Sequence, residues 1–430
     1  MISGPLWERV EARLVAARPA ALAAELVRIP SRPGVPRQEE AVARHLAAWL
    51  VERGVAADLA EVTPGRPNVI ATVGSRDAGA PRLLLCGHTD TVPLNAGDAG
   101  HGFSGEVRDG RLLGRGAVDM KGPLAAMAAA LVAVDEVLAE VGASAVLAAV
   151  VDEEMESLGA EALVCSGLRA DGAVVGEPTG NRIALGHRGL EWLAIDFHGR
   201  AAHGGAPERG VNAISAAARF IALAEARLVP SFAPRRHSLL GPPTLNFGTI
   251  RGGDQPSTVA AACTLTLDRR SVPGESYAGI VAELETLLAE VEAVMPGLRT
   301  TLRRLEGGMA TLEHVALETP ADHPLARAAF AARRFVTGDV SDEPVAFPAW
   351  TDGALLAAFA GIPTIVLGPG DLADAHSPRE SIGVAELEEG ARIYAALALE
   401  WAQTVARRAT GTATVAHDET ATLRRDTPSR

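Results

Sequence analysis

The stretch SAVLAAVVDEE (residues 144–154) joins an uninterrupted apolar run to three consecutive acids. An apolar run of this length, rich in Ala and Val and bounded by polar residues, is typical of a strand buried on both faces of a parallel sheet. Functional side chains of open α/β sheets gather beyond the carboxyl ends of such strands. The stretch therefore predicts an α/β fold with carboxylates at the end of this strand, at Glu153 and Glu154.

Helices and strands alternate on both sides of this stretch. The helices are predicted from apolar spacing and end signals, and the strands from short β-type runs. The predicted helices before residue 186 are 12–28, 38–53, 122–141 and 161–165, and the predicted strands are 68–73, 82–86, 144–151 and 172–175. This alternation predicts a mostly parallel, doubly wound sheet covered on both faces.

The pattern changes near residue 186 and returns to the first kind near residue 319. The elements predicted between these points are strand 191–198, helix 212–228, strands 244–251 and 258–269, helix 277–294 and strand 299–305. This β-α-β-β-α-β order is the ferredoxin-like arrangement. The elements predicted after it are helices 325–335 and 354–360, strand 364–367 and helix 386–402.

We therefore expect one discontinuous larger domain, formed by residues 1–185 and 319–405, and a smaller α+β domain inserted at residues 186–318. A length of 430 residues also favours two domains over one. The remaining residues, 406–430, are rich in Thr, Ala and Arg and poor in large apolar side chains, which predicts a disordered tail.

Composition narrows the class of protein. Hydrophobic residues make up 48% of the chain, which is ordinary for a globular protein, and the net charge of −13 argues against nucleic acid or an anionic membrane as a partner. The three cysteines are far apart and fit neither a disulfide framework nor a Cys-type zinc site. The N-terminus does not resemble a signal peptide, and apolar runs such as 143–151 are too short to span a bilayer. We expect a soluble, cytoplasmic protein.

Five residues of metal-binding types follow predicted strands or lie in one late loop: His88, Asp119, Glu154, Glu177 and His376. Singly, each has an ordinary explanation as a structural histidine, a helix cap or a turn residue. Together, two imidazoles and three carboxylates at one sheet edge are too many polar groups for a core. They fit a pair of divalent metal ions.

The chain contains a single lysine among its 40 basic residues, and it is Lys121, two positions after Asp119. A strong bias towards arginine with one stray lysine would explain it. A tightly packed position beside the metal residues would also explain it, because Arg and Lys are not equivalent where space is limited. The sequence leaves both explanations open.

These motifs resemble the zinc-dependent amidohydrolase and peptidase family of acetylornithine deacetylase, succinyl-diaminopimelate desuccinylase, aminoacylase and glutamate carboxypeptidase. The similar stretches are GHTDTVP (87–93), GRGAVDMKG (114–122), DEE (152–154), GEP (176–178), AHGGAPERGVNAI (202–214), DRRSVPGE (268–275), TDG (351–353) and GPG…AHSPRE (368–380). The resemblance implies a catalytic domain, a ferredoxin-like lid that forms a homodimer, and two Zn²⁺ ions for which Co²⁺ or Mn²⁺ can substitute.

The resemblance also implies a role for each metal residue. Asp119 is expected to bridge the two ions. His88 and Glu177 would complete one site, and Glu154 and His376 the other.

Three further residues are expected to assist the reaction. Asp90 would orient the His88 imidazole, and Glu153 would act as the general base. His203 resembles the lid histidine that stabilises the oxyanion, often across a dimer interface. A surface position in the lid is the alternative for His203.

Substrate contacts are expected from the lid and from one loop. Arg270 lies where a lid arginine often binds the substrate carboxylate, and the backbone N–H groups of Gly368 and Gly370 could bind the same anion. The alternatives are a surface salt bridge and a simple turn. Thr258, Ala261 and Ala354 replace the Asn, Pro and Arg of many relatives, which weighs against acetylornithine and succinyl-diaminopimelate as substrates.

The leading hypothesis is hydrolysis of the amide bond of an N-acyl amino acid, a small molecule with a carboxylate, by a two-metal site. A carboxypeptidase or dipeptidase of the same family is the alternative. A catalytically silent metal-binding homologue is a remote third possibility, and the presence of Glu153 argues against it.

Overall fold

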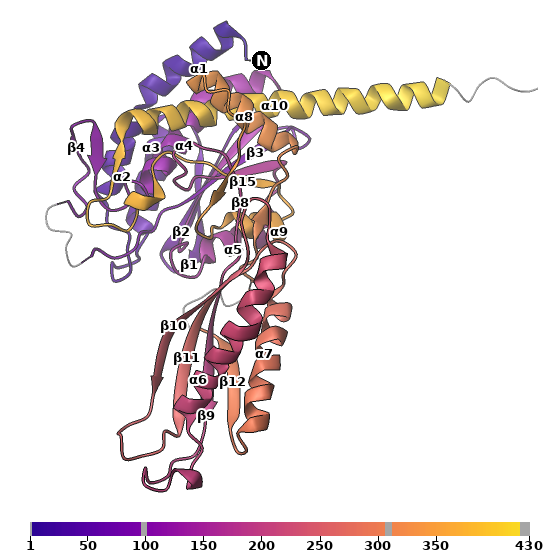
Figure 1. Cartoon of the computed structure of the whole chain (residues 1–430). Coiled ribbons are helices and arrows are strands. Elements are labelled where there is room, and N and C mark those ends of the chain that lie inside the picture. Colours follow the sequence, from indigo (N-terminus) through magenta and orange to yellow (C-terminus); the bar gives the residue numbers. More distant parts are fainter. Residues whose placement is uncertain (1, 96–100, 306–311, 422–430) are drawn as a thin grey trace, which may run out of the picture.

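The computed structural model describes residues 2–95, 101–305 and 312–421, with side chains described up to residue 405. The larger of its two lobes is built on a nine-stranded sheet and the smaller on a four-stranded sheet (Figure 1). The fold is the α/β arrangement expected from the sequence.

The larger sheet is parallel at its centre and antiparallel at its flanks. Its strands, in spatial order, are β1 (Ala57–Thr63), β2 (Arg66–Gly74), β6 (Ser144–Val150), β3 (Arg82–His88), β7 (Gly172–Val175), β15 (Thr364–Val366), β8 (Ala184–His187) and β13 (Leu317–Glu318), with β14 (Val345–Phe347) also beside β8. The pairs β6–β3, β3–β7 and β7–β15 are parallel. Their carboxyl ends therefore meet at one edge of the sheet.

Helices cover both faces of this sheet. The helices of the larger lobe are α1 (Gly4–Ala17), α2 (Pro19–Val27), α3 (Glu40–Glu52), α4 (Lys121–Glu140), α5 (Leu158–Cys165), α8 (Pro324–Thr337), α9 (Gly353–Ala358) and α10 (Val384–Ala421). Leu83 and Leu85 of β3 pack with the core formed by α1–α4, α8 and α10. Leu84 and Cys86 face the other side, in the core with α5 and α9. This alternation is that of a strand buried on both faces.

The smaller lobe has the predicted β-α-β-β-α-β order. Its elements are β9 (Glu191–His198), α6 (Ala213–Leu223) continued by η2 (Ala224–Leu228) and η3 (Val229–Arg235), β10 (Thr244–Gly252), β11 (Ala262–Arg270), α7 (Tyr277–Val294) and β12 (Arg299–Arg304). The sheet order is β10-β11-β9-β12, and all pairs are antiparallel. Helices α6 and α7 pack on one face (Figure 1), where Phe197, Phe220 and Leu284 belong to a separate core.

A small third sheet joins two distant loops. Strands β4 (Glu106–Arg108) and β5 (Arg111–Leu113) form a hairpin, and β16 (Ser381–Gly383) pairs with β5. The chain after residue 376 is thereby fastened next to the chain before residue 119. Two short 3₁₀ turns complete the described elements, η1 (Pro207–Arg209) and η4 (Leu372–Asp374).

Three segments differ from the sequence prediction. The predicted helix 12–28 is two helices, because Arg18 adopts a left-handed conformation with φ of 53° directly before Pro19. The predicted strand 258–269 begins only at Ala262. Helix α10 continues from Val384 to Ala421, through part of the segment expected to be disordered, while residues 422–430 lie outside the described residues.

Helix α4 is long and apolar enough to cross a membrane by length and composition alone, but 83% of its most apolar window is buried inside the protein. It packs between the sheet and helices α1, α2 and α10. Its apolar composition is therefore that of a central core helix.

Candidate metal centre

The five expected metal residues come together at the carboxyl edge of the central strands. His88 ends β3, Glu154 follows β6, Glu177 follows β7, Asp119 precedes α4, and His376 follows the η4 turn. Strand order explains this placement, since β6, β3 and β7 are neighbours and parallel.

Asp119 lies between the two histidines. Its Oδ1 is 2.9 Å from Nε2 of His88, and its Oδ2 is 3.1 Å from Nε2 of His376. Glu177 lies on the His88 side, with Oε1 3.7 Å from Nε2 of His88. Glu154 lies on the other side, with Oε1 3.1 Å from Nε2 of His376. The carboxylate of Asp119 thus divides the cluster into two halves, each with one imidazole and one further acid.

Burial and mutual repulsion perturb the acids of this cluster. Burial raises the pKa of Glu153 and of Glu177 well above the usual range, and the charge of a neighbouring acid adds to each shift. Burial, followed by the charge of Asp119, also raises the pKa of Glu154. Such a group of buried acids requires positive charge nearby if its members are to be ionised together.

The pKa values of the two histidines are also raised, which for an imidazole favours the charged form. Hydrogen bonds to Asp119 and Glu154 raise the pKa of His376 to about 10. Burial acts to lower the pKa of His88, but its bonds to Asp119 and Asp90 outweigh burial and raise it well above normal. Without metal, protons on the imidazoles therefore take the positions that cations would otherwise fill.

The donor set fits divalent metal ions. Ligand atoms of His88, Asp119 and Glu154 lie within 4.8 Å of one another, and so do those of His88, Glu153 and Glu177. The Oε1 atom of Glu177 is buried and has no hydrogen-bond partner in the described part of the chain. Mixed imidazole and carboxylate donors suit zinc, with cobalt or manganese as possible substitutes.

Asp90 positions the two acids that follow β6. Its Oδ1 accepts a hydrogen bond from the backbone N–H of Glu153, and its Oδ2 accepts one from Glu154, both at 3.1 Å. Nδ1 of His88 lies 3.0 Å from the carbonyl oxygen of Asp90 and 3.5 Å from its carboxylate. The expected contact with the His88 imidazole is therefore made mainly by the backbone carbonyl of Asp90. The carboxylate of Asp90 instead accepts the backbone hydrogen bonds of Glu153 and Glu154.

Glu380 holds the loop that carries Asp119. One carboxylate oxygen accepts hydrogen bonds from the N–H groups of Gly116, Val118 and Asp119, at 2.9, 3.0 and 3.1 Å. The other accepts a hydrogen bond from Arg115, and both side chains of this ion pair are buried. Glu380 belongs to the stretch GPG…AHSPRE (368–380), and no role was predicted for it. The feature of the sequence that could have identified Glu380 is its position four residues after the predicted metal ligand His376.

Lys121 occupies a packed position and is not a stray surface residue. Its side chain is fully buried, and Nζ donates a hydrogen bond of 2.6 Å to the carbonyl oxygen of Ile29. Burial lowers the pKa of Lys121 to about 7. The second of the two explanations left open by the sequence is correct.

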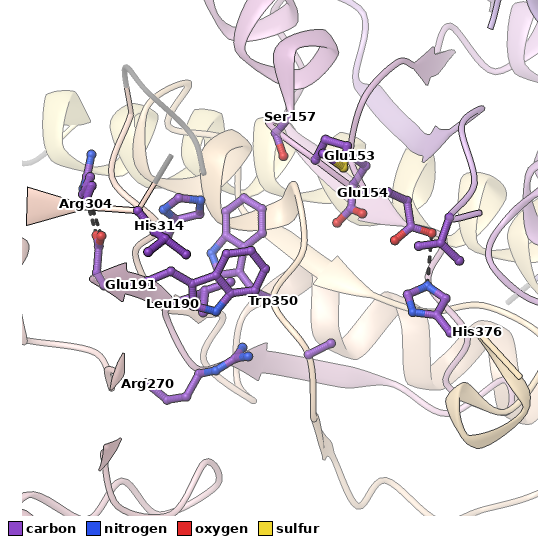
Figure 2. Close-up of a pocket in the computed structure, with 15 residues that line it drawn as sticks. Glu153, Glu154, Ser157, Leu190, Glu191, Arg270, Arg304, His314, Trp350 and His376 are labelled. Carbon is purple, nitrogen blue, oxygen red and sulfur yellow. Dashed lines mark hydrogen bonds and ion pairs between the residues drawn. The ribbon is translucent and has the colours of Figure 1, made fainter. Parts of the chain in front are cut away.

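A cavity of about 480 Å³ opens beside Glu153 and Glu154 and reaches the smaller lobe (Figure 2). Figure 2 shows Glu153, Glu154 and His376 at one end, and Trp350, His314, Leu190 and Arg270 at the other. The lining residues come from both lobes, so a bound molecule can reach the metal centre while contacting the lid.

Arg270 is one of the residues that line the cavity, and its guanidinium is paired with Asp268 at 2.8 and 3.0 Å. His203 is exposed and lies outside the cavity lining, where its Nδ1 accepts a hydrogen bond from the N–H of Gly205. Its expected role across a dimer interface stays a prediction.

The prediction that the backbone N–H groups of Gly368 and Gly370 bind a substrate anion is wrong. The N–H of Gly368 donates to Oγ1 of Thr179 at 3.1 Å, and that of Gly370 donates to Oε1 of Glu386 at 2.9 Å. Both glycines are buried and neither lines the cavity. Their N–H groups fasten the loop to its neighbours and are not offered to a substrate.

Asp352 is a buried acid that the sequence analysis did not single out. Burial raises the pKa of Asp352 to about 7, and its charge contributes to the raised pKa values of Glu153 and Glu177. It directly follows Thr351, whose hydroxyl lies 3.1 Å from Nε2 of the buried His187. The TDG stretch therefore shapes the electrostatic surroundings of Glu153.

Comparison with known proteins agrees with this geometry. Residues 84–400 match the model of peptidase family M20/M25/M40. The chain is 32% identical to acetylornithine deacetylase of Proteus mirabilis over 359 residues, covering 82% of this chain and 87% of that protein. It is equally similar, 32% over 356 residues, to acetylornithine deacetylase of Photorhabdus laumondii, covering 81% and 87%.

Solved structures share the fold. An aminopeptidase from Bacillus cereus superposes with a TM-score of 0.72 at 22% identity, covering 90% of this chain and 98% of that one. A dinuclear metal-binding peptidase of the M20 family from Bacillus subtilis superposes with a TM-score of 0.67 at 14% identity, covering 90% and 98%. From the family match and the curated relatives, the chain belongs to peptidase family M20/M25/M40 and is a metal-dependent hydrolase.

Proposed function

We propose that this protein hydrolyses the amide bond of an N-acyl amino acid at a centre of two zinc ions. The observation that carries the proposal is the position of Asp119, whose two oxygens face His88 and His376 from between two further acids. Asp119 would bridge the ions, with His88 and Glu177 holding one and Glu154 and His376 the other. Cobalt or manganese would be able to replace zinc.

When bound, the metal ions would polarise the substrate carbonyl and lower the pKa of the attacking water. Glu153 would accept the proton of that water, because its carboxylate lies beside the centre, with Oε2 4.0 Å from Nε2 of His88. Glu153 would then pass that proton to the leaving amine. Asp90 would keep Glu153 in place through the backbone hydrogen bond described above.

The lid supplies the other proposed contacts. Arg270 would exchange Asp268 for the carboxylate of the substrate, since its side chain is partly exposed in the cavity. His203 would stabilise the oxyanion from the partner lid of a homodimer formed through the domain at about residues 186–318. We place the protein in the cytoplasm, because its cysteines Cys86, Cys165 and Cys263 are all unpaired.

A metallo-carboxypeptidase or dipeptidase is the second candidate, since the bond broken is also an amide and the cavity is long enough to reach from the metal residues to the lid. A silent metal-binding protein is the third, and the position of Glu153 beside the cluster argues against it.

The test combines metal content with turnover. Wild type and Glu153→Ala would be loaded with zinc, and the metal bound per chain would be measured before assay on N-acetyl amino acids, N-succinyl amino acids and dipeptides. We expect two metals in both proteins and a loss of activity of about 10³-fold or more in the variant. Turnover of dipeptides alone would favour the peptidase, while an active Glu153→Ala variant would refute the proposed base.

A further inference from the structure

The indole of Trp350 forms one wall of the cavity beside the candidate metal centre (Figure 2). Its Nε1 donates a hydrogen bond of 3.1 Å to the carbonyl oxygen of Val315, so its one polar atom is bonded within the protein. Two imidazoles hold the ring at an angle, His314 at 5.1 Å between ring centres and His187 at 6.1 Å. Trp350 therefore presents a fixed apolar surface to the cavity.

The two imidazoles that contact Trp350 have lowered pKa values, and one of them, His314, itself lines the cavity. Burial lowers the pKa of His187 and of His314 to about 4. The charge of Arg270 acts in the same direction on His187, and the charges of Arg304 and then Arg270 do so on His314. Arg270 and Trp350 line the same end of the cavity, as Figure 2 shows.

The charged side chains at this end are paired within the protein, Glu191 with Arg304 and Arg270 with Asp268. Glu191 lines the cavity but is held by Arg304 through two hydrogen bonds, of 3.0 and 2.8 Å. A substrate ammonium group would have to displace Arg304 to reach it, and would also approach Arg270. Leu190 and Leu305 complete the apolar lining near Trp350. A cationic side chain such as that of ornithine finds poor surroundings here.

We propose that the half of the substrate bound at this end is an amino acid with a large apolar or aromatic side chain. Its carboxylate would meet Arg270, its side chain would pack on Trp350, and its acylated nitrogen would face the metal residues. This inference rests on the proposed function, and it names the class of amino acid released by the reaction. N-acetylphenylalanine and N-acetylleucine represent that class, and N-acetylornithine represents the excluded one.

The turnover test compares substrates that differ only in side chain. Zinc-loaded wild type is expected to show a kcat/KM for N-acetylphenylalanine roughly 10- to 100-fold above that for N-acetylornithine or N-acetylalanine. Trp350→Ala should lower the phenylalanine-to-alanine ratio by about 10-fold, and Trp350→Phe should restore most of it. Trp7→Ala is the matched control, because Trp7 also makes an edge-on pair, with Phe335 at 5.0 Å, but does not line the cavity.

A binding measurement separates failure of this inference from failure of the proposed function. Zinc-loaded Glu153→Ala would be titrated by calorimetry with N-acetylphenylalanine and N-acetylornithine. Phenylalanine binding at least about 10-fold tighter supports the inference even if no amide is hydrolysed by wild type, which would contradict the proposed function alone. Equal or tighter binding of the ornithine compound overturns the inference. So does a phenylalanine-to-alanine ratio that Trp350→Ala leaves unchanged.

Discussion

Replacing Asp90 by Asn tests whether a carboxylate outside the cavity lining sets the position of the proposed general base, Glu153. Asp90 is fully buried, and each of its two oxygens accepts one backbone N–H, from Glu153 and from Glu154. Asn has the same shape but only one acceptor oxygen, so its amide group would face the second N–H. Losing a hydrogen bond to a charged group and leaving a buried donor unsatisfied costs about 2–3 kcal/mol of unfolding free energy.

The catalytic effect should be separable from this loss of stability. A displaced Glu153 lowers kcat, by about 10- to 100-fold, while KM stays close to that of wild type because Asp90 does not itself line the cavity. Urea unfolding and steady-state kinetics at saturating zinc would measure the two effects. Asp135→Ala is the control, since Asp135 also accepts a backbone N–H, from Gly74 at 2.9 Å, but lies towards the far end of helix α4.

The control should lose stability and keep wild-type kcat. A raised KM with unchanged kcat in Asp90→Asn would refute the reasoning, because it would mean that the residue acts on substrate binding. Wild-type kcat combined with lower stability would refute it as well, since the position of Glu153 would then not depend on Asp90.

Three further predictions follow from the same contacts. Glu380→Ala leaves three backbone N–H groups around Asp119 without their acceptor, and zinc affinity measured by competition with a chelating dye should fall about 10- to 100-fold; unchanged affinity would show that Glu380 does not position Asp119. Chelation should lower the melting temperature more at pH 9 than at pH 5. Glu153, Glu177 and His376 have raised pKa values, so their bound protons stabilise the metal-free fold at low pH, and this stabilisation is lost as the pH rises through those pKa values. A change in melting temperature on chelation that does not depend on pH would contradict this prediction. His187, whose pKa is lowered to about 4, must stay neutral in the fold, so unfolding free energy should fall by about 2 kcal/mol between pH 6.5 and 5, and His187→Gln should remove that part of the slope in urea titrations.

The parts of the fold that follow from local pattern were predictable. The apolar run before Asp152 is β6, and the expected strand 172–175 is β7 with the same bounds. Because these strands are parallel neighbours of β3, the acids after them and His88 had to meet at one edge. The break at Arg18 was also signalled, by Pro19, although the apolar spacing on both sides suggested one helix.

The supporting contacts depend on how distant loops are arranged, and local pattern does not contain that arrangement. Asp90 and Glu153 are 63 residues apart, and Glu380 and Asp119 are 261 apart. Gly368 was expected to offer its N–H to a ligand, but its partner, Thr179, lies 189 residues earlier in the chain. Trp350 is held at the cavity by a hydrogen bond to Val315 and a ring contact with His314, which both belong to a separate segment of the chain. Identifying such partners requires the folded chain.

The burial of Lys121 has a consequence for the chemistry of the whole surface. Because it is the only lysine in the sequence and is fully enclosed, the side chains that carry a permanent positive charge into solvent are all arginines. Acetylation, ubiquitin-type conjugation and glutaraldehyde cross-linking all require an accessible lysine amine, so no side chain of the folded protein is a substrate for them. Its surface arginines also keep their charge up to pH values near 12, since arginine does not lose its proton below that range.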